Sequence, residues 1–258
     1  MAFVSAPREL VFPEFELANW TAAGMDAMQD RQFDFSGMSG MDRRTWIGLA
    51  TAVFLVGSYG AAAETDGSSL AGTWLVDTQT SRVFIFVDKT GFGHQHGVAG
   101  LVQSGSLTLH ATRDAGRLVF AMSRFTADTA EARRYCGLSG ETDKKTMEKV
   151  NQNMLGAAVL DVARHPEATF QVDSSLPTGS LSRSGMPLYE LSGTFTLHGV
   201  SHPLRVVAEA SNQNGSVHLR GQFKLSQTRY GIKPFSAVLG AVGVADELII
   251  CGEFDLRR

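Results

Sequence analysis

Apolar and polar residues alternate with a period of two over residues 186–225. The alternation comes in three runs, before, after and beyond the segment Thr194–Leu204, and in each run the apolar residues fall on one face. Such alternation is typical of β-strands with one buried face and one solvated face. Because the runs are joined by short connections containing glycine, the pattern predicts an antiparallel meander.

The rest of the chain carries the same signal more weakly. Extended segments are predicted at 73–77, 82–89, 91–110, 117–125, 168–173 and 247–257. Residues 143–155 change to helical spacing through Met147, Val150 and Met154, which predicts an amphipathic helix. Residues 126–142, 177–185 and 230–246 are expected to be connections. The pattern therefore predicts an all-β, antiparallel barrel of about eight strands with one helical insertion.

The N-terminal part resembles an export signal. Arg43 and Arg44 precede an apolar run over 45–59, and Ala61–Ala63 form a small-residue cleavage site, so residues 41–63 are predicted to be a signal peptide. The run is shorter than the roughly 20 residues of a bilayer span. We therefore expect no stable membrane span after processing and a protein exported to the periplasm, by the Sec route or by the twin-arginine route.

The predicted domain boundaries follow from this signal. Residues 1–40 precede it and are interpreted as a mis-annotated or disordered extension, with translation starting at Met38 or Met41. Residues 64–69 form a polar leader, and residues 70–258 form the barrel domain.

Composition changes this picture little. The chain is 43% hydrophobic and 19% charged with a net charge of −3, which is globular and gives no sign of a nucleic-acid partner. The sequence contains neither a G-x-S-x-G nucleophile elbow nor a G-x-G-x-x-G loop that opens a helix. We therefore expect that the protein is not an enzyme and uses no cofactor.

Four segments together resemble the YceI-like family of exported, polyisoprenoid-binding lipocalin-like barrels. These are GTWLVDTQTSRVFIFV (72–87), VLDVARHPEATF (159–170), GTFTLHGVSHPL (193–204) and ELIICGEFDL (247–256). The resemblance implies a periplasmic carrier that holds a polyisoprenoid, or a similar amphiphilic lipid such as an isoprenoid quinone, in the barrel lumen. A homodimer, and a filled lumen serving a stress or interaction module, stay open as alternatives.

A lumen for an apolar chain needs apolar residues on the inner face of the strands. The lining is predicted to consist of Phe84, Phe86, Phe120, Met154, Phe170, Leu191, Phe195, Leu197, Val206, Leu219 and Phe223. For each of these residues the alternative is an ordinary core position.

His94 and His96 are the candidate polar residues of the site. They stand two residues apart on an extended segment, so both are expected on one side of it. They are candidate polar anchors for a ligand at the cavity mouth. In the alternative, they are the first two ligands of a metal-binding protein or metal-dependent enzyme, with His198, His202, Asp88 or Glu190 completing the set.

Two further features leave alternatives open. Cys136 and Cys251 would meet an oxidising compartment after export, so a disulfide between the 126–142 loop and the barrel wall is a candidate. Arg133, Arg134, Lys144 and Lys145 form either a contact for an anionic head group or a solvated face.

Overall fold

The computed structural model describes residues 70–258 except residue 214. The predictions for residues 1–40, 41–63 and 64–69 lie outside the described residues. Residues 64–258 form a compact unit by themselves. All strand pairs of the described sheet fall within 72–257, so this segment contains every partner that its strands need.

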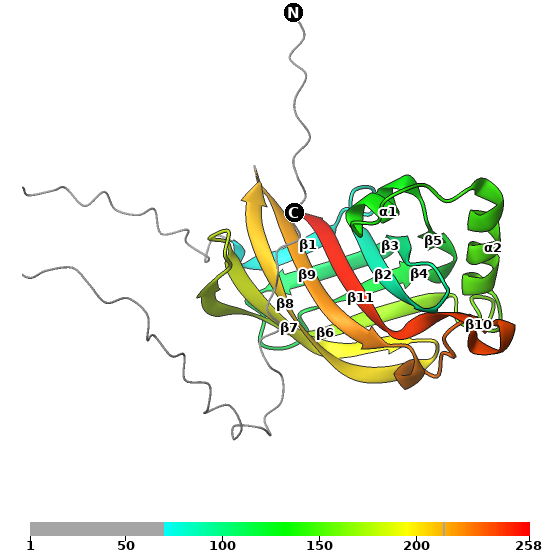
Figure 1. Ribbon diagram of the computed structural model, residues 1–258. Helices are drawn as coiled ribbons and strands as arrows, with labels where there is room; N and C mark the ends of the chain where they lie inside the picture. The colour runs from blue at the N-terminus through cyan, green and yellow to red at the C-terminus, as the bar shows by residue number, and fades with distance from the viewer. Residues whose placement is uncertain (1–69, 214) are drawn as a thin grey trace, which may run out of the picture. The chain divides into compact units, whose positions relative to one another are not determined.

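The described residues form one antiparallel sheet of eleven strands (Figure 1). The strands are β1 (Gly72–Val76), β2 (Arg82–Gly91), β3 (His96–Leu109), β4 (Gly116–Ala121), β5 (Thr126–Ala127), β6 (Glu167–Leu181), β7 (Pro187–Leu197), β8 (Val200–Gln213), β9 (Ser216–Ser226), β10 (Ser236–Ala237) and β11 (Val242–Arg257). The helices are α1 (Ala130–Tyr135) and α2 (Lys144–Leu155), with short 3-10 helices η2 (Met122–Arg124), η3 (Thr228–Tyr230) and η4 (Val238–Gly240).

Eight of these strands close into a barrel, as the alternation predicted. The order runs β11-β2-β3-β4-β6-β7-β8-β9, and β9 pairs again with β11. The short strands β1, β5 and β10 add to the two ends of this ring. Closure leaves no free edge among these eight strands, which removes the usual site of edge-to-edge aggregation.

Strands β7, β8 and β9 confirm the predicted meander. The inward residues Tyr189, Leu191, Phe195 and Leu197 of β7 are buried, and the residues between them are partly exposed. Strand β11 confirms the predicted inward face from Leu248 to Leu256, although it begins at Val242, earlier than predicted.

Three segments predicted as connections contain regular structure. The 126–142 segment holds β5 and α1, so the fold has two α-helices instead of one insertion. Thr129 caps α1 by accepting a hydrogen bond from the Ala132 amide. Threonine is a preferred N-cap residue, so this helix start is visible in the sequence. Residues 230–246 hold β10 and η4 and the start of β11, and β6 extends through 177–181.

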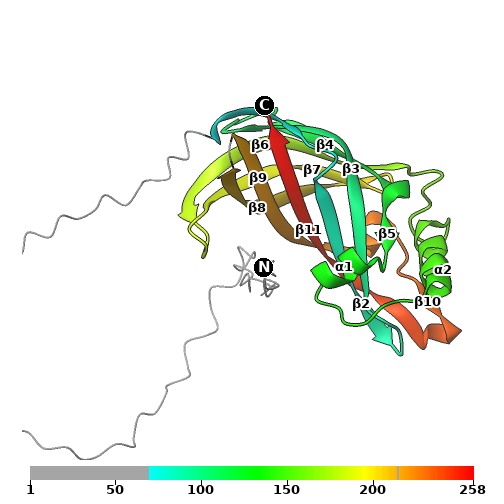
Figure 2. The ribbon, with the colours of Figure 1, turned by 90° about the horizontal axis from the view of Figure 1, so that it is seen from above.

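The largest fully buried side chains lie toward one end of the barrel, within an apolar core that also includes residues of the other end, such as Val98 and Leu225. At the end where β1 crosses β3, Trp74, Leu107, Leu109, Tyr189 and Leu256 are almost completely inaccessible to solvent. We call this the packed half. The opposite end carries α2 and β10, which lie near each other in two perpendicular views (Figures 1 and 2).

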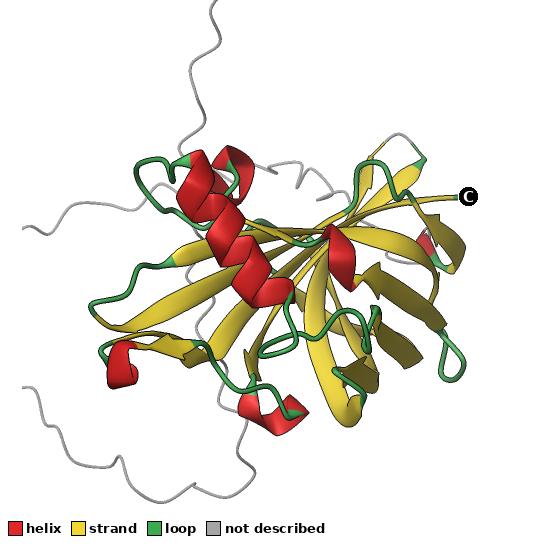
Figure 3. Ribbon diagram, turned by 90° about the vertical axis from the view of Figure 1, so that its right-hand side faces the viewer, coloured by secondary structure: helices red, strands yellow, loops and turns green. Residues whose placement is uncertain are grey.

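Helix α2 lies across the end of the barrel opposite the packed half (Figure 3). Asp143 caps the helix by accepting a hydrogen bond from the Thr146 amide at 3.0 Å. No residue of α2 is buried, so packing holds the helix weakly. Asn151 provides the specific attachment, because its side chain bonds both the amide (2.8 Å) and the carbonyl (3.3 Å) of Ala127 in β5.

Candidate functional site: an apolar cavity in one half of the barrel

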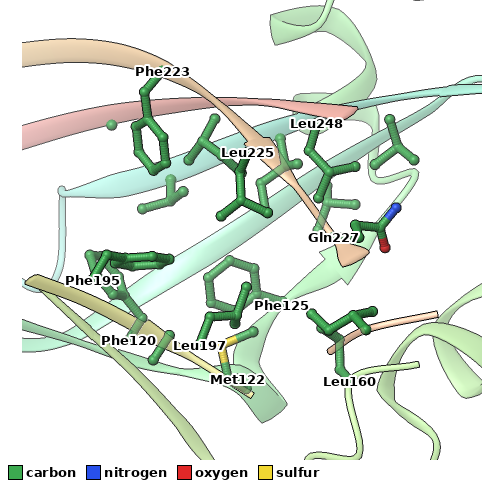
Figure 4. A pocket seen from close by; sticks show the side chains of 18 of the residues that line it. Phe120, Met122, Phe125, Leu160, Phe195, Leu197, Phe223, Leu225, Gln227 and Leu248 are labelled. Atoms are coloured by element: carbon green, nitrogen blue, oxygen red, sulfur yellow. The ribbon is translucent and has the colours of Figure 1, made fainter. Parts of the chain in front are cut away.

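A cavity of about 250 Å³ occupies the half of the barrel next to α2. We call this the hollow half. Its walls come from all eight barrel strands, from α2 and from the segment that leads into β10. Side chains from opposite walls point into the same space, with Phe223, Leu225 and Leu248 facing Phe120 and Phe195 (Figure 4). The cavity therefore lies inside the barrel and not in a surface cleft.

The lining is almost entirely apolar. Among the described lining residues, the only polar side chains are those of His96, Asn153 and Gln227. Typical small-molecule pockets measure about 300–1,000 Å³, so this cavity suits one slender apolar group. The presence of a cavity contradicts the filled-lumen alternative.

Most of the predicted lumen residues do line the cavity. Nine of the predicted residues lie in the cavity wall, and their contact with a ligand stays a prediction: Phe120, Met154, Phe170, Leu191, Phe195, Leu197, Val206, Leu219 and Phe223. Met154 reaches the cavity from α2, which together with Val150 makes the helix part of the wall.

Phe84 and Phe86 were predicted in the lumen, and this is wrong. Val83, Ile85 and Val87 line the cavity, so the alternate residues of β2 belong to its outer face. The ring of Phe84 stacks on Tyr135 of α1, with centroids 3.8 Å apart. Strand β2 thus faces the cavity on its inner side and packs against α1 on its outer side.

His96 is the one predicted histidine that reaches the cavity. Its Nδ1 lies 2.7 Å from Oδ2 of Asp128, a residue whose side chain is 1% exposed. The carboxylate can only accept, so Nδ1 carries the proton and Nε2 is the nitrogen left for the cavity. Gln227, another polar residue of the lining, lies near Leu248 in the cavity wall (Figure 4).

Asp128 fixes the orientation of this imidazole. It also accepts hydrogen bonds from Arg133 Nη1 and from the Gly97 amide, both at 3.3 Å. Burial acts to raise the pKa of Asp128, but the hydrogen bond and charge of His96, the Gly97 amide and Arg133 hold it below its usual value. The sequence prediction missed Asp128, because a carboxylate in an apparent loop gives no sign of burial.

Arg133 therefore belongs to this buried network rather than to a solvated face. Its guanidinium also donates to the carbonyls of Ser139 and Gly140, which ties the loop after α1 to the Asp128 carboxylate. In the described part of the chain, the side chains of Arg134, Lys144 and Lys145 form no comparable hydrogen bond or ion pair, and all three residues are exposed.

His94 does not share the environment of His96. It is exposed and lies in the turn before β3, outside the extended segment that was predicted to hold both residues. Within residues 70–258, residue 214 aside, no group of three or more His, Cys, Asp or Glu side chains could hold a metal ion. His202 instead donates to the Arg229 carbonyl at 2.8 Å, and His198 packs on the ring of His165.

Cys136 and Cys251 both lie against the outer wall of the barrel. The Cys136 thiol donates to the carbonyl of Ile85 at 3.6 Å, and Cys251 pairs with Phe84 across the β2–β11 ladder. Both are free thiols, and burial raises the pKa of Cys136 to about 12 and that of Cys251 to about 11. The disulfide stays a prediction, which a thiol titration of the folded protein would test.

A charged cluster covers the outer wall beside these thiols. His218 lies between Glu253 (Nε2–Oε2 3.3 Å) and Asp255 (Nδ1–Oδ1 2.9 Å), and Tyr135 donates to Glu253 at 2.6 Å. The hydrogen bond to Glu253, with that to Asp255, raises the pKa of His218 to about 9 against the opposing effect of burial. His218 is therefore protonated at neutral pH. Its ion pairs with Glu253 and Asp255 lie on the outer face of the barrel wall, away from the cavity.

A closed eight-stranded antiparallel barrel with one apolar internal cavity defines a small class of proteins with room for an apolar ligand. Residues 74–254 match the model of the YceI-like domain. The chain belongs to the YceI-like domain family. Among the described residues, no helix has the length and apolar character needed to cross a membrane.

One solved structure with a TM-score above 0.5 supports the fold. A polyisoprenoid-binding domain from Saccharophagus degradans, implicated in plant cell wall breakdown, is 13% identical with a TM-score of 0.51. The similarity covers 71% of this chain and 97% of that domain. BcnA of Burkholderia cenocepacia is 14% identical with a TM-score of 0.46, over 70% of this chain and 98% of BcnA. No curated protein matches the chain.

Proposed function

We propose that this protein is a carrier that holds one polyisoprenoid, or a similar lipid such as an isoprenoid quinone, in the hollow half of the barrel. The observation that carries the proposal is a cavity with only three polar side chains in its wall, inside a barrel whose other half is filled. Burial of an apolar chain in such a space contributes about 25 cal/mol per Å² before the cost of association.

The polar side chains suggest how the ligand is oriented. His96 begins β3, Asn153 lies on α2 and Gln227 follows β9, so all three belong to the end of the barrel that carries α2. The polar head of the ligand would lie among these residues, and its chain would run toward Phe223 and Phe254. With Nδ1 bonded to Asp128, a neutral His96 offers an acceptor at Nε2, which favours a head group with a hydroxyl.

The proposal includes three further properties: the location of the protein, binding without catalysis, and the class of the ligand. The signal peptide predicted from the sequence at 41–63 supports export and a periplasmic location. The absence of a nucleophile motif and the apolar wall support binding without catalysis. The known polyisoprenoid-binding domain with the same fold supports the ligand class.

The test fills the cavity and compares a matched change outside it. Val206 lines the cavity, and its neighbour Val207 is 41% exposed on the other face of β8. In the 64–258 form, Val206→Phe should weaken binding of a fluorescent prenyl alcohol by at least about tenfold, because the ring occupies the ligand's space. Val207→Phe should leave affinity unchanged. Equal affinity of both variants and the parent would overturn the proposal.

A further inference from the structure

Three large apolar side chains project from one end of the molecule. Phe92 is 87% exposed, Val238 is 73% exposed and Leu239 is fully exposed, at 109% of its reference area. We call these residues the apolar tip. Single exposed apolar residues are common on soluble proteins, but a contiguous group is typical of an interaction surface.

The apolar tip belongs to two segments that are joined by hydrogen bonds. The Phe92 amide donates to the Ala241 carbonyl at 2.9 Å, and Gly91 pairs with Val242 across the β2–β11 ladder. Gly91 has φ +59°, and a Cβ there would lie 2.3 Å from the Ala241 carbonyl oxygen. This close approach holds the two segments together, so Phe92 and η4 form one projection.

The backbone of η4 is strained in a way that exposes its side chains. Val238 and Leu239 have φ values of 51° and 54°, in the left-handed region that residues other than glycine seldom adopt and that β-branched residues such as valine adopt least. Such conformations cost free energy and persist where the surrounding structure imposes them. No core contact explains the positive φ values of Val238 and Leu239, since both side chains are exposed.

The apolar tip is continuous with the wall of the cavity. Phe235, three residues before Val238, lines the cavity and accepts a hydrogen bond from the Val244 amide at 3.1 Å. Helix α2 lies at the same end of the barrel (Figures 1 and 2). It carries three exposed lysines, Lys144, Lys145 and Lys149, against one glutamate, which complements an anionic surface.

We propose that the apolar tip inserts into a phospholipid bilayer and that the lysines of α2 face its anionic head groups. This docking rests on the proposed function for its purpose, because it would bring the cavity to the membrane in which an isoprenoid lipid dissolves. The docking itself needs no bound ligand. An apolar contact supported by a few basic residues gives reversible attachment, in contrast to a spanning helix.

The experiment uses the 64–258 form, because the apolar run at 45–59 would bind membranes by itself. Co-sedimentation is measured with vesicles of phosphatidylethanolamine and phosphatidylglycerol. The variant Phe92→Ser/Val238→Ser/Leu239→Ser should partition at least about tenfold more weakly than the parent. The matched control is Leu181→Ser, because Leu181 is 60% exposed at the far end of β6 and should have no effect.

A second variant tests insertion without removing apolar surface. Phe92→Trp places an indole at the tip, and the only other tryptophan of the 64–258 form, Trp74, is 2% exposed. Its emission should shift to shorter wavelength with vesicles, and brominated lipids should quench it. Unchanged emission, or unchanged partition of the serine variant, would overturn the proposal.

Two further measurements distinguish the membrane-docking proposal from its alternatives and from the carrier function. If the serine variant instead changes the mass measured by light scattering, the apolar tip contacts a second copy of the chain and the membrane proposal fails. The prenyl-alcohol assay is run on the same samples. Vesicle binding by a protein that binds no prenyl alcohol would remove the carrier function and leave the docking, and the reverse result would remove the docking alone.

Discussion

The two halves of this barrel are built from the same strands but differ in what fills them. In the packed half, Trp74, Leu107, Leu109 and Tyr189 are almost completely inaccessible to solvent. In the hollow half, the inward residues of those strands surround a cavity. Stability and binding are therefore divided along the length of the barrel. Close packing stabilises one half, and looser packing makes room for a ligand in the other.

The largest difference should appear on truncation of matched leucines. Leu109 is 1% exposed in the packed half, and Leu225 is 4% exposed but lines the cavity. Leu109→Ala should lower the free energy of unfolding by about 3–5 kcal/mol, because it creates a new void in a filled region. Leu225→Ala should cost about half as much, because part of its surroundings is already empty. Urea unfolding of the lipid-free protein measures both changes in the free energy of unfolding. Equal losses for the two variants would show that the two halves do not differ in packing.

The outer wall should make stability depend on pH. His218 has a folded pKa of about 9 against an ordinary value of 6.5. Its contribution is therefore complete below pH 6.5 and is lost as pH rises through about 9. The free energy of unfolding should fall by on the order of 2 kcal/mol across this window. His218→Gln should flatten that fall in urea titrations, and an unchanged slope in the variant would rule out this role.

The attachment of α2 should depend on a single side chain. Asn151→Ala removes both hydrogen bonds to Ala127, a residue that is 1% exposed, and should cost about 1–2 kcal/mol. Because α2 has no buried residue, hydrogen exchange should rise in α2 before it rises in the barrel strands. Gln152→Ala is the control on the exposed side of the same helix. Uniform protection in both variants would show that packing alone holds the helix.

The smallest effect concerns the polar end of the cavity. His96→Ala should weaken binding of a prenyl alcohol by about 1 kcal/mol, or roughly fivefold, through loss of one hydrogen bond. A prenyl hydrocarbon without the hydroxyl should bind both proteins equally. His94→Ala should change neither affinity, since His94 is exposed and outside the cavity wall. A loss of affinity that is equal for both probes would mean that His96 acts through packing.

The barrel could be predicted from the sequence because the meander of β7, β8 and β9 has one clearly apolar face. The inner face of β2 could not, because both of its faces are apolar and only the pairing with β3 and β11 decides which one is inside. Phe84 and Phe86 were misplaced for this reason. Asp128 and Asn151 were missed because their roles depend on partners far along the chain, and alternation reports burial but not partners.

The depth of the cavity could not be predicted either. Leu107 and Leu225 have the same chemistry and the same inward orientation, yet one lies in filled core and the other in a cavity wall. The difference arises from how many large side chains meet at each level of the barrel, which depends on the register of all eight strands.

The decisive experiment is native mass spectrometry of the 64–258 form purified from its own organism. If the hollow half holds a lipid, one lipid per chain should be bound and released by organic solvent, and it should be lost in the Val206→Phe variant but not in Val207→Phe. A protein that carries no lipid, or that carries a stoichiometric metal ion in its place, would contradict the carrier function.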